Sequence, residues 1–316
     1  MANVKTNSLK AWVLAARPKT LTGASVPVMI GISMSWRDAV GDFQWIAAIL
    51  CFLFAFLMQI DANFINDYFD YKHGNDDDTR LGPRRACAEG WITLSAMRRG
   101  IILTTLLSCM IGLPLIFYGG WQMIIVGILC VVFCFLYTTT LSYHGWGDVL
   151  VLIFFGIVPV CLTYYVTMPQ DSQTIPVDVF LASIACGLVI DTLLIVNNYR
   201  DRDNDKKAGK RTLVVRTGAS NSEKLYWGVG VIAILCNAVL FLCGNNGTPW
   251  WLRISNALVL LIIYGGLHDH AYRRMCAIHQ GKMLNTILGK TARNMFFYGI
   301  IVSAATIVSS ILALYP

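Results

Sequence analysis

Long apolar stretches alternate with short polar segments along almost the whole chain. Runs such as 46–57 and 123–136 are apolar on every side, whereas strands of a membrane barrel would alternate apolar and polar residues. The pattern therefore predicts an all-α integral membrane protein. Windows long enough to span a bilayer core, about 17 to 25 residues each, number nine: 20–36, 45–65, 97–117, 120–138, 147–167, 178–197, 226–243, 251–267 and 295–314.

Composition supports this class and excludes a soluble protein. Of the 316 residues, 56% are hydrophobic and only 14% are charged, against roughly 25% charged in soluble domains. We expect the nine transmembrane helices to form one bundle around a central cavity. The bundle would be a single domain over 1–316, with pseudo-repeat halves of about 1–138 and 139–316.

The basic residues predict the orientation, because cytoplasmic loops near helix ends are enriched in lysine and arginine. Nine crossings with a cytoplasmic N-terminus place 1–19, 66–98, 139–146, 198–225 and 268–294 inside. Of the 25 basic residues, all but Arg37 and Arg253 lie in these segments or at their edges. The net charge of +7 is therefore a loop bias that suits lipid headgroups and an anionic substrate rather than nucleic acid.

Two acidic segments follow apolar runs and share the frame Asn-[Asp/Asn]-Tyr-x-Asp. The first runs from Asn66 to Asp70, and the second from Asn197 to Asp201. Polar groups at this density are costly if they face lipid, at about 2.5–3.5 kcal/mol for a charge near the bilayer centre. Both segments should therefore face the interior of the bundle, at its cytoplasmic end.

Helical spacing predicts which side chains of the first segment act together. Asn66 and Asp70 fall on one face, with Asn63 beside them and Asp67 adjacent. Carboxylate and amide oxygens at this spacing suit a metal ion. The alternative is a solvated acidic helix end.

The second segment repeats the arrangement. Asn197, Asp201 and Asp205 lie four residues apart and share one face if the helix continues, whereas Asp203 should face solvent. Arg200 adjoins the shared face.

Together the two segments suggest a diphosphate site. Magnesium prefers six oxygens and commonly binds one or two carboxylates plus substrate phosphates and water. Arg200, Lys72 and the arginines of 80–85 can neutralise the remaining charge. The apolar bundle behind the site suits an isoprenoid tail.

Other polar residues have a less definite role. Arg17, before the first apolar window, either contacts headgroups or binds an anion at the cavity mouth. Asp61 and Asp191 lie within apolar runs and are candidates for function by default, with no partner evident. We expect 268–270, His-Asp-His, to form an interfacial loop rather than a metal site, because successive residues do not share a helix face.

The motifs and their order resemble the UbiA superfamily of intramembrane aromatic prenyltransferases, and within it the MenA type that acts on 1,4-dihydroxy-2-naphthoate. The resemblance spans essentially the whole chain. It is carried by Ala16-Arg17-Pro18-Lys19-Thr20-Leu21, Asn66-Asp67-Tyr68 through Gly74-x-Asp76, Arg80-Leu81-Gly82-Pro83, and Asn197-Asn198-Tyr199-Arg200-Asp201 through Ala208-Gly209-Lys210-Arg211-Thr212.

The resemblance implies roles for individual residues. The implied Mg²⁺ site comprises Asn66, Asp70, Asp76, Asp201 and Asp205, and Asp67 joins the catalytic group. The implied substrate contacts are Arg17, Asn63, Lys72, Arg84, Tyr137, Asn197, Arg200 and Lys210.

The chain departs from the superfamily pattern in three places. Gly74 replaces the third aspartate of the first motif, so either Asp76 substitutes or the site uses fewer carboxylates. Asn197 replaces the first aspartate of the second motif. Residues 142–144, Ser-Tyr-His, stand where members of the family often place a lysine or arginine, so the resemblance gives no support for a lysine or arginine contact from that loop.

The implied reaction is transfer of a polyprenyl group from its diphosphate to 1,4-dihydroxy-2-naphthoate, with loss of the carboxylate, to give demethylmenaquinone at the cytoplasmic face of the inner membrane. One alternative is another aromatic acceptor, such as 4-hydroxybenzoate, homogentisate or a porphyrin. A cation transporter is the alternative from another class, although transporter sites usually lie near the membrane midplane.

Overall fold

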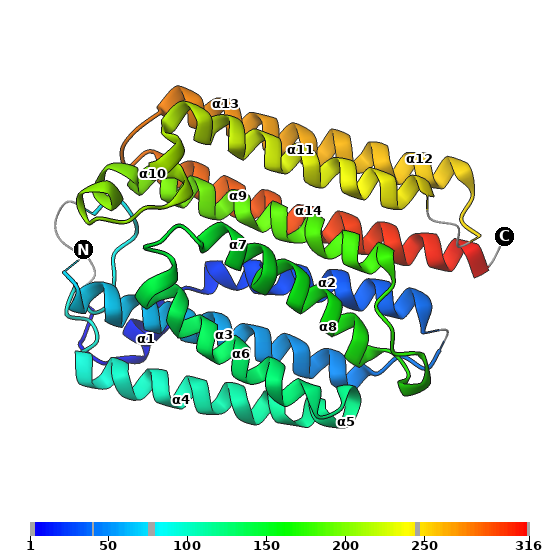
Figure 1. Ribbon diagram of the computed structural model, residues 1–316, viewed down its shortest axis with the longest axis horizontal. Helices are drawn as coiled ribbons and strands as arrows, with labels where there is room; N and C mark the ends of the chain where they lie inside the picture. Colours follow the sequence, from blue (N-terminus) through cyan, green and yellow to red (C-terminus); the bar gives the residue numbers. More distant parts are fainter. Residues whose placement is uncertain (1–3, 40, 75–79, 244–246, 315–316) are drawn as a thin grey trace.

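The computed structural model describes residues 4–39, 41–74, 80–243 and 247–314, and every regular element in these ranges is helical. The long helices lie roughly side by side, and the two termini are at opposite ends of the bundle (Figure 1). The longer helices are α2 (Leu21–Asp38), α3 (Trp45–Lys72), α4 (Leu94–Gly112), α6 (Gln122–Leu136), α8 (Val158–Thr167), α9 (Val177–Lys207), α11 (Ala219–Cys243), α12 (Trp250–Val259), α13 (Gly266–Ile278) and α14 (Leu284–Leu314). The short ones are α1 (Leu9–Ala16), α5 (Ile116–Gly119), α7 (Gly147–Val151) and α10 (Leu213–Thr217).

Eight helical segments of the described chain are long and apolar enough to cross a membrane: Trp45–Lys72, Leu94–Gly119, Gln122–Leu141, Gly147–Thr167, Val177–Lys207, Ala219–Cys243, Trp250–Ile278 and Leu284–Ala313. They coincide with eight of the nine predicted windows. The ninth window, 20–36, falls on α2, which is not among them. This helix contains Pro27 and several serines and glycines, and most of its side chains are buried. A helix enclosed by its neighbours does not need a continuous apolar surface. The nine crossings and the cytoplasmic N-terminus stay predictions.

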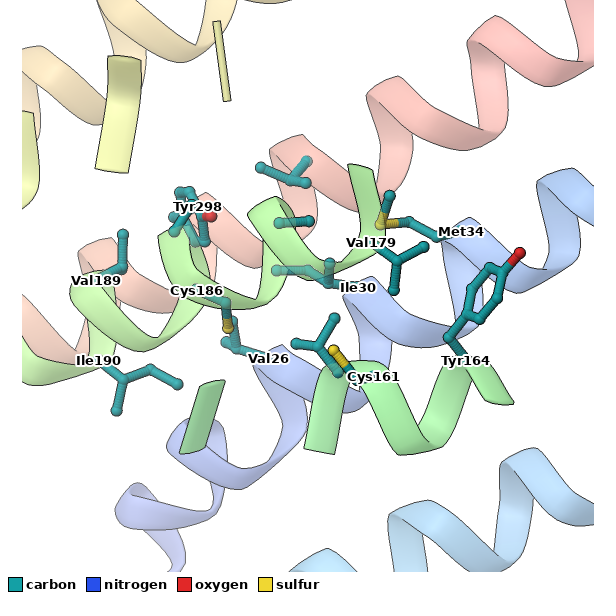
Figure 2. Packing of buried hydrophobic residues seen from close by; sticks show 14 of the residues in the cluster. Val26, Ile30, Met34, Cys161, Tyr164, Val179, Cys186, Val189, Ile190 and Tyr298 are labelled. Carbon is teal, nitrogen blue, oxygen red and sulfur yellow. The ribbon is translucent and has the colours of Figure 1, made fainter. Parts of the chain in front are cut away.

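The largest hydrophobic cluster joins α2, α8, α9 and α14 (Figure 2). The cluster includes Val26 and Ile30 of α2, Cys186 and Val189 of α9, and Tyr298 of α14. Burial of these side chains away from water and lipid fixes α2 and α9 against each other. The positions of the polar residues farther along both helices follow from this packing.

Small residues allow the closest helix crossings. A Cβ atom on Gly31 of α2 would lie 2.7 Å from the Val160 carbonyl oxygen of α8. A Cβ atom on Gly156 would lie 2.6 Å from the Gly187 Cα of α9. Close backbone approach of this kind is how membrane helices gain packing contacts, so an alanine at either site would push two helices apart.

Several helices run beyond the windows predicted for them, and two of these extensions carry the acidic segments. The windows 45–65 and 178–197 become α3, which ends at Lys72, and α9, which ends at Lys207. Both acidic segments are therefore helical throughout their described residues, as their spacing predicted.

The prediction of an interfacial loop at 268–270 is wrong. These residues lie in α13, and only 2% of His268 is exposed. Its ring stacks on Tyr226 with centroids 4.7 Å apart, and His268 Nε2 lies 3.2 Å from the Trp227 carbonyl oxygen. The aromatic surface offered by α11 buries the histidine, and sequence spacing gave no sign of it.

Candidate active site

A cavity of about 1580 Å³ lies between α2, α3, α6, α8 and α9. Its larger part is apolar, with Phe54, Met58, Phe133 and Phe154 in the wall. Its polar residues come mainly from the end of α1, the ends of α3 and α9 and the segment before α10, and α1 and α10 lie at one end of the bundle (Figure 1). The predicted site residues in its wall are Arg17, Asn66, Asp70, Arg84, Tyr137, Asn197, Arg200, Asp201, Asp205 and Lys210. The structure therefore brings both acidic helix faces to one cavity.

On α3, Asn66 and Asp70 face the cavity together. The Asn66 Oδ1 atom accepts a hydrogen bond of 2.8 Å from Thr138 Oγ1, in the π-helical turn Tyr137–Leu141 that ends α6. The Asp70 carboxylate accepts one of 2.9 Å from Arg85 Nη2. Both oxygen donors are thus oriented by neighbours from other elements.

On α9, Arg200 organises the second acidic face. Its guanidinium donates to both carboxylate oxygens of Asp201, with Nε to Oδ1 at 2.8 Å, and its Nη2 donates to Asn197 Oδ1 at 2.9 Å. Only 2% of Arg200 is exposed. In this arrangement the guanidinium orients Asp201, and its predicted diphosphate contact stays a prediction.

One turn later, Asp205 lies 3.9 Å from Lys210 Nζ, and that ammonium group also lies 4.8 Å from the centre of the Tyr143 ring. An aromatic face attracts a cation. The loop 142–144 has no lysine or arginine, but its Tyr143 helps to hold the Lys210 ammonium group near Asp205. Asp203 is exposed, as predicted, and accepts a hydrogen bond from Gln280.

Three predicted residues lie outside the cavity wall. The Asn63 amide group donates to the Ala16 carbonyl oxygen at 3.0 Å and to Thr20 Oγ1 at 2.9 Å, so it ties α3 to the end of α1 and to the residue before α2. Lys72 is exposed at the end of α3. The third residue is Asp67.

Asp67 is fully buried and stabilises the loop after α3. Its two carboxylate oxygens accept hydrogen bonds from the backbone N–H groups of Ala86 (2.9 Å) and Cys87 (3.0 Å). Arg17 Nη2 lies 3.8 Å away. Asp67 thus positions the segment that carries Arg85, the partner of Asp70.

Arg17 has the most unusual environment of the cationic residues in the wall. It ends α1 in the left-handed region, with φ 51°, where a non-glycine residue is strained. Its Nη2 atom is buried and has no hydrogen-bond partner among the described residues. Burial, and next the Arg85 guanidinium, lowers the pKa of Arg17 to about 9. A buried guanidinium with an unused hydrogen-bond donor is suited to bind an anionic ligand.

The donor set fits magnesium, although not as a preformed protein cage. No group of three His, Cys, Asp or Glu side chains at metal-binding distances occurs within the described ranges. Magnesium needs only one or two carboxylates when substrate phosphates and water complete the shell, and the two helix faces offer amide and carboxylate oxygens. Asp76 lies outside the described residues.

The intramembrane acids differ from the cavity residues. Asp61 is fully buried and accepts hydrogen bonds from the hydroxyl groups of Thr104 and Thr105 on α4. Asp191 is 6% exposed, and its Oδ1 atom has no hydrogen-bond partner in the described chain. Neither acid lines the cavity. Asp61 therefore has a structural partner that the sequence did not reveal.

Sequence reasoning also missed Asn285, a polar residue of the cavity wall. Asn285, in the first turn of α14, lines the cavity and contacts both Arg200 and the loop after α3. The window 295–314 placed it in a loop. The helix in fact begins at Leu284, and a polar residue in line with Gly289 and Ala292 was the available signal.

The UbiA prenyltransferase family model matches residues 24–286. The chain belongs to this family. Among curated UbiA relatives, the 1,4-dihydroxy-2-naphthoate octaprenyltransferase of Escherichia coli is 31% identical over 94% of this chain and 96% of that protein. The enzyme of the same name from Haemophilus influenzae is 35% identical over 72% of this chain and 76% of that protein.

Solved structures of UbiA proteins share the fold. A UbiA homolog from Archaeoglobus fulgidus bound to DMAPP and Mg²⁺ superposes with a TM-score of 0.58 at 17% identity, covering 93% of this chain and 99% of that one. A digeranylgeranylglyceryl phosphate synthase gives 0.58 at 20% identity, covering 96% and 99%. These structures show the shared fold, and the family model with the curated relatives shows that this chain is a UbiA-type membrane prenyltransferase.

Proposed function

We propose that this UbiA-family protein transfers a polyprenyl group from its diphosphate to 1,4-dihydroxy-2-naphthoate. The observation that carries the proposal is the single cavity, which joins two acidic helix faces to a long apolar space. A magnesium-bound diphosphate head requires the acidic helix faces, and an isoprenoid tail requires the long apolar space. The naphthoate acceptor is supported by relatives at 31% and 35% identity that bear this name.

Magnesium would be held by Asn66 and Asp70 from α3 and by Asp201 and Asp205 from α9, together with the diphosphate oxygens. When bound, it supplies the positive charge that stabilises the departing diphosphate. Arg200 fixes the direction of the Asp201 carboxylate.

The cations at the cavity mouth complete the diphosphate site. Arg17 and Arg84 approach from the α1 side and from the loop after α3, and Lys210 approaches from the segment after α9. Charge-assisted hydrogen bonds from such groups are about twice as strong as neutral ones. Tyr137 and the phenylalanines of the wall would keep water from the reacting allylic carbon.

In the proposed reaction the ring carbon that carries the carboxylate forms a bond to C1 of the prenyl group. The bond between C1 and the diphosphate oxygen breaks, and diphosphate leaves with the electron pair. The bond to the carboxylate then breaks, CO₂ leaves, and its electrons restore the aromatic ring. The product is the hydroquinone form of demethylmenaquinone.

The chemistry would take place at the cytoplasmic face of the inner membrane, in one domain of two related halves. The basic loops support this orientation, since the polar end of the cavity is the end where they gather. Multi-pass insertion is supported by the eight long apolar segments.

The experiment is incubation of the purified protein with dihydroxynaphthoate and prenyl diphosphates of several lengths, with and without magnesium, followed by mass spectrometry. A prenylated product that has lost the mass of CO₂, formed only with magnesium, is expected. Transfer to 4-hydroxybenzoate or homogentisate instead would show that the proposed acceptor is wrong. Magnesium flux without prenyl transfer would show that the protein is a transporter and not the proposed enzyme.

A further inference from the structure

We propose that Asn285 is a positioning residue that fastens the loop after α3 over the second acidic face. Its Nδ2 atom donates a hydrogen bond of 2.8 Å to the Leu81 carbonyl oxygen, 204 residues away in the chain. Its Oδ1 atom accepts one of 2.9 Å from Arg200 Nη1. One amide group thus joins α14, α9 and the loop, and the inference rests on the proposed function of the cavity that these elements line.

The loop lies directly on Arg200 at this point. A Cβ atom on Gly82 would lie 2.8 Å from Arg200 Nη2, so only glycine allows this approach without a shift. Arg200 in turn holds both oxygens of Asp201. The position of the loop and the direction of the Asp201 carboxylate are therefore coupled through a single guanidinium.

The other end of the loop is fixed independently. Asp67 accepts the backbone N–H groups of Ala86 and Cys87, and Arg85 donates to Asp70. Segment 80–87 is thus fastened to α3 at one end and to α14 at the other, across the polar mouth of the cavity. Arg80 and Arg84 line the cavity from this segment, so Asn285 determines where their charges stand relative to a bound diphosphate.

Loss of this fastening should weaken binding of the prenyl diphosphate more than it slows the chemical step. The loop cations act on the diphosphate both before and during bond breaking, and loss of such uniform binding raises KM with little change in kcat. One hydrogen bond to a backbone carbonyl contributes about 0.5–1.5 kcal/mol. Loss of that free energy from substrate binding corresponds to a rise in KM of about twofold to tenfold.

The test uses Asn285→Ala and Asn285→Asp in the full-length protein. The aspartate keeps an acceptor for Arg200 and cannot donate to Leu81, but it also adds a negative charge beside Arg200, so its result is compared with that of Gly82→Ala, which adds no charge. The matched control is Asn294→Ala on the same helix, whose Nδ2 atom also donates to a backbone carbonyl, that of Leu267 at 2.9 Å. Asn294 is 3% exposed and does not line the cavity. Gly82→Ala disturbs the same contact from the loop side.

Two readouts are measured for each variant that keeps the wild-type elution profile: KM and kcat for the prenyl diphosphate, and the rate of tryptic cleavage at Arg80 and Arg85. We expect both Asn285 variants and Gly82→Ala to show higher KM and faster cleavage, with a smaller change in kcat than in KM and with KM unchanged in the control. Wild-type KM and cleavage in Asn285→Asp and Gly82→Ala would overturn the proposal. If the wild-type protein transfers no prenyl group, the proposed function fails, while the cleavage rates still test the loop contact.

Discussion

Arg85 Nη2 lies 2.9 Å from Asp70 Oδ2, and both side chains are nearly buried. An acid of the first helix face is therefore paired with a cation of the loop that follows it. If a magnesium diphosphate binds at the proposed site, Asp70 would be available to the metal and Arg85 to a phosphate oxygen. The pair keeps both charges partnered, which lowers the cost of burying them.

Removal of either acid should abolish transfer. Asp70→Ala and Asp201→Ala each take one carboxylate from the proposed magnesium site, and we expect activity to fall at least about a hundredfold, as for the loss of one electrostatic contact to a transition state. The measurement is product formation across a magnesium titration, with elution profiles to verify folding.

The control for the variants Asp70→Ala and Asp201→Ala is Asp203→Ala. Asp203 lies on the same helix as Asp201 but is exposed and does not line the cavity, so its loss should leave the rate within about twofold, as for a surface substitution. Retained activity in both Asp70→Ala and Asp201→Ala would contradict the site.

Helical periodicity predicted correctly which polar residues of each acidic segment share a helix face, and their binding of a metal stays a prediction. Asn66 with Asp70, and Asn197 with Asp201 and Asp205, line one cavity because a spacing of four places side chains on one face whatever the helix packs against. The eight apolar segments followed from the same local reasoning.

Contacts between distant elements were beyond this reasoning. The sequence placed Asp67 adjacent to the face of Asn66 and Asp70 and in the catalytic group, yet Asp67 turns away from the cavity to bind backbone N–H groups of the loop. Asn285 meets Leu81 across 204 residues. Such pairings depend on how helices cross and where loops return, and a single sequence carries no periodic signal for either.

Asp67 should behave as a structural acid. In Asp67→Ala the backbone N–H groups of Ala86 and Cys87 lose their acceptors, at about 1–3 kcal/mol for each buried group. We expect a lower melting temperature and faster tryptic cleavage at Arg85. Asp67→Asn keeps one acceptor oxygen and should be intermediate. Wild-type melting and cleavage in Asp67→Ala would show that these hydrogen bonds contribute nothing.

Asp61 should affect stability without affecting substrate affinity. It bonds to Thr104 and Thr105 of α4 and does not line the cavity. Hydrogen bonds between membrane helices contribute about 0.6 kcal/mol on average and up to about 1.7. We therefore expect Asp61→Ala to melt at a lower temperature with KM unchanged, and Thr105→Val to show a smaller loss. A rise in KM at constant melting temperature would assign Asp61 to the site instead.

Arg17 should lower the stability of the substrate-free protein and strengthen its binding of the prenyl diphosphate. Its pKa is lowered to about 9 by burial and then by Arg85, so the charged form is disfavoured in the folded protein. Without substrate, Arg17→Met should therefore melt at a higher temperature than the wild type at pH 7. The unfolded chain binds the proton more tightly, so wild-type stability rises as the pH passes through about 9, and the difference in melting temperature narrows between pH 7 and pH 10.

Substrate should reverse that order. Loss of a charge-assisted contact of about 1.5–3 kcal/mol weakens prenyl diphosphate binding about tenfold to a hundredfold, so saturating diphosphate should raise the melting temperature of the wild type more than that of Arg17→Met. Arg273→Met is the control, because that side chain is 77% exposed and pairs with Asp269 one turn away. Equal diphosphate affinity in Arg17→Met and the wild type would remove Arg17 from the binding site.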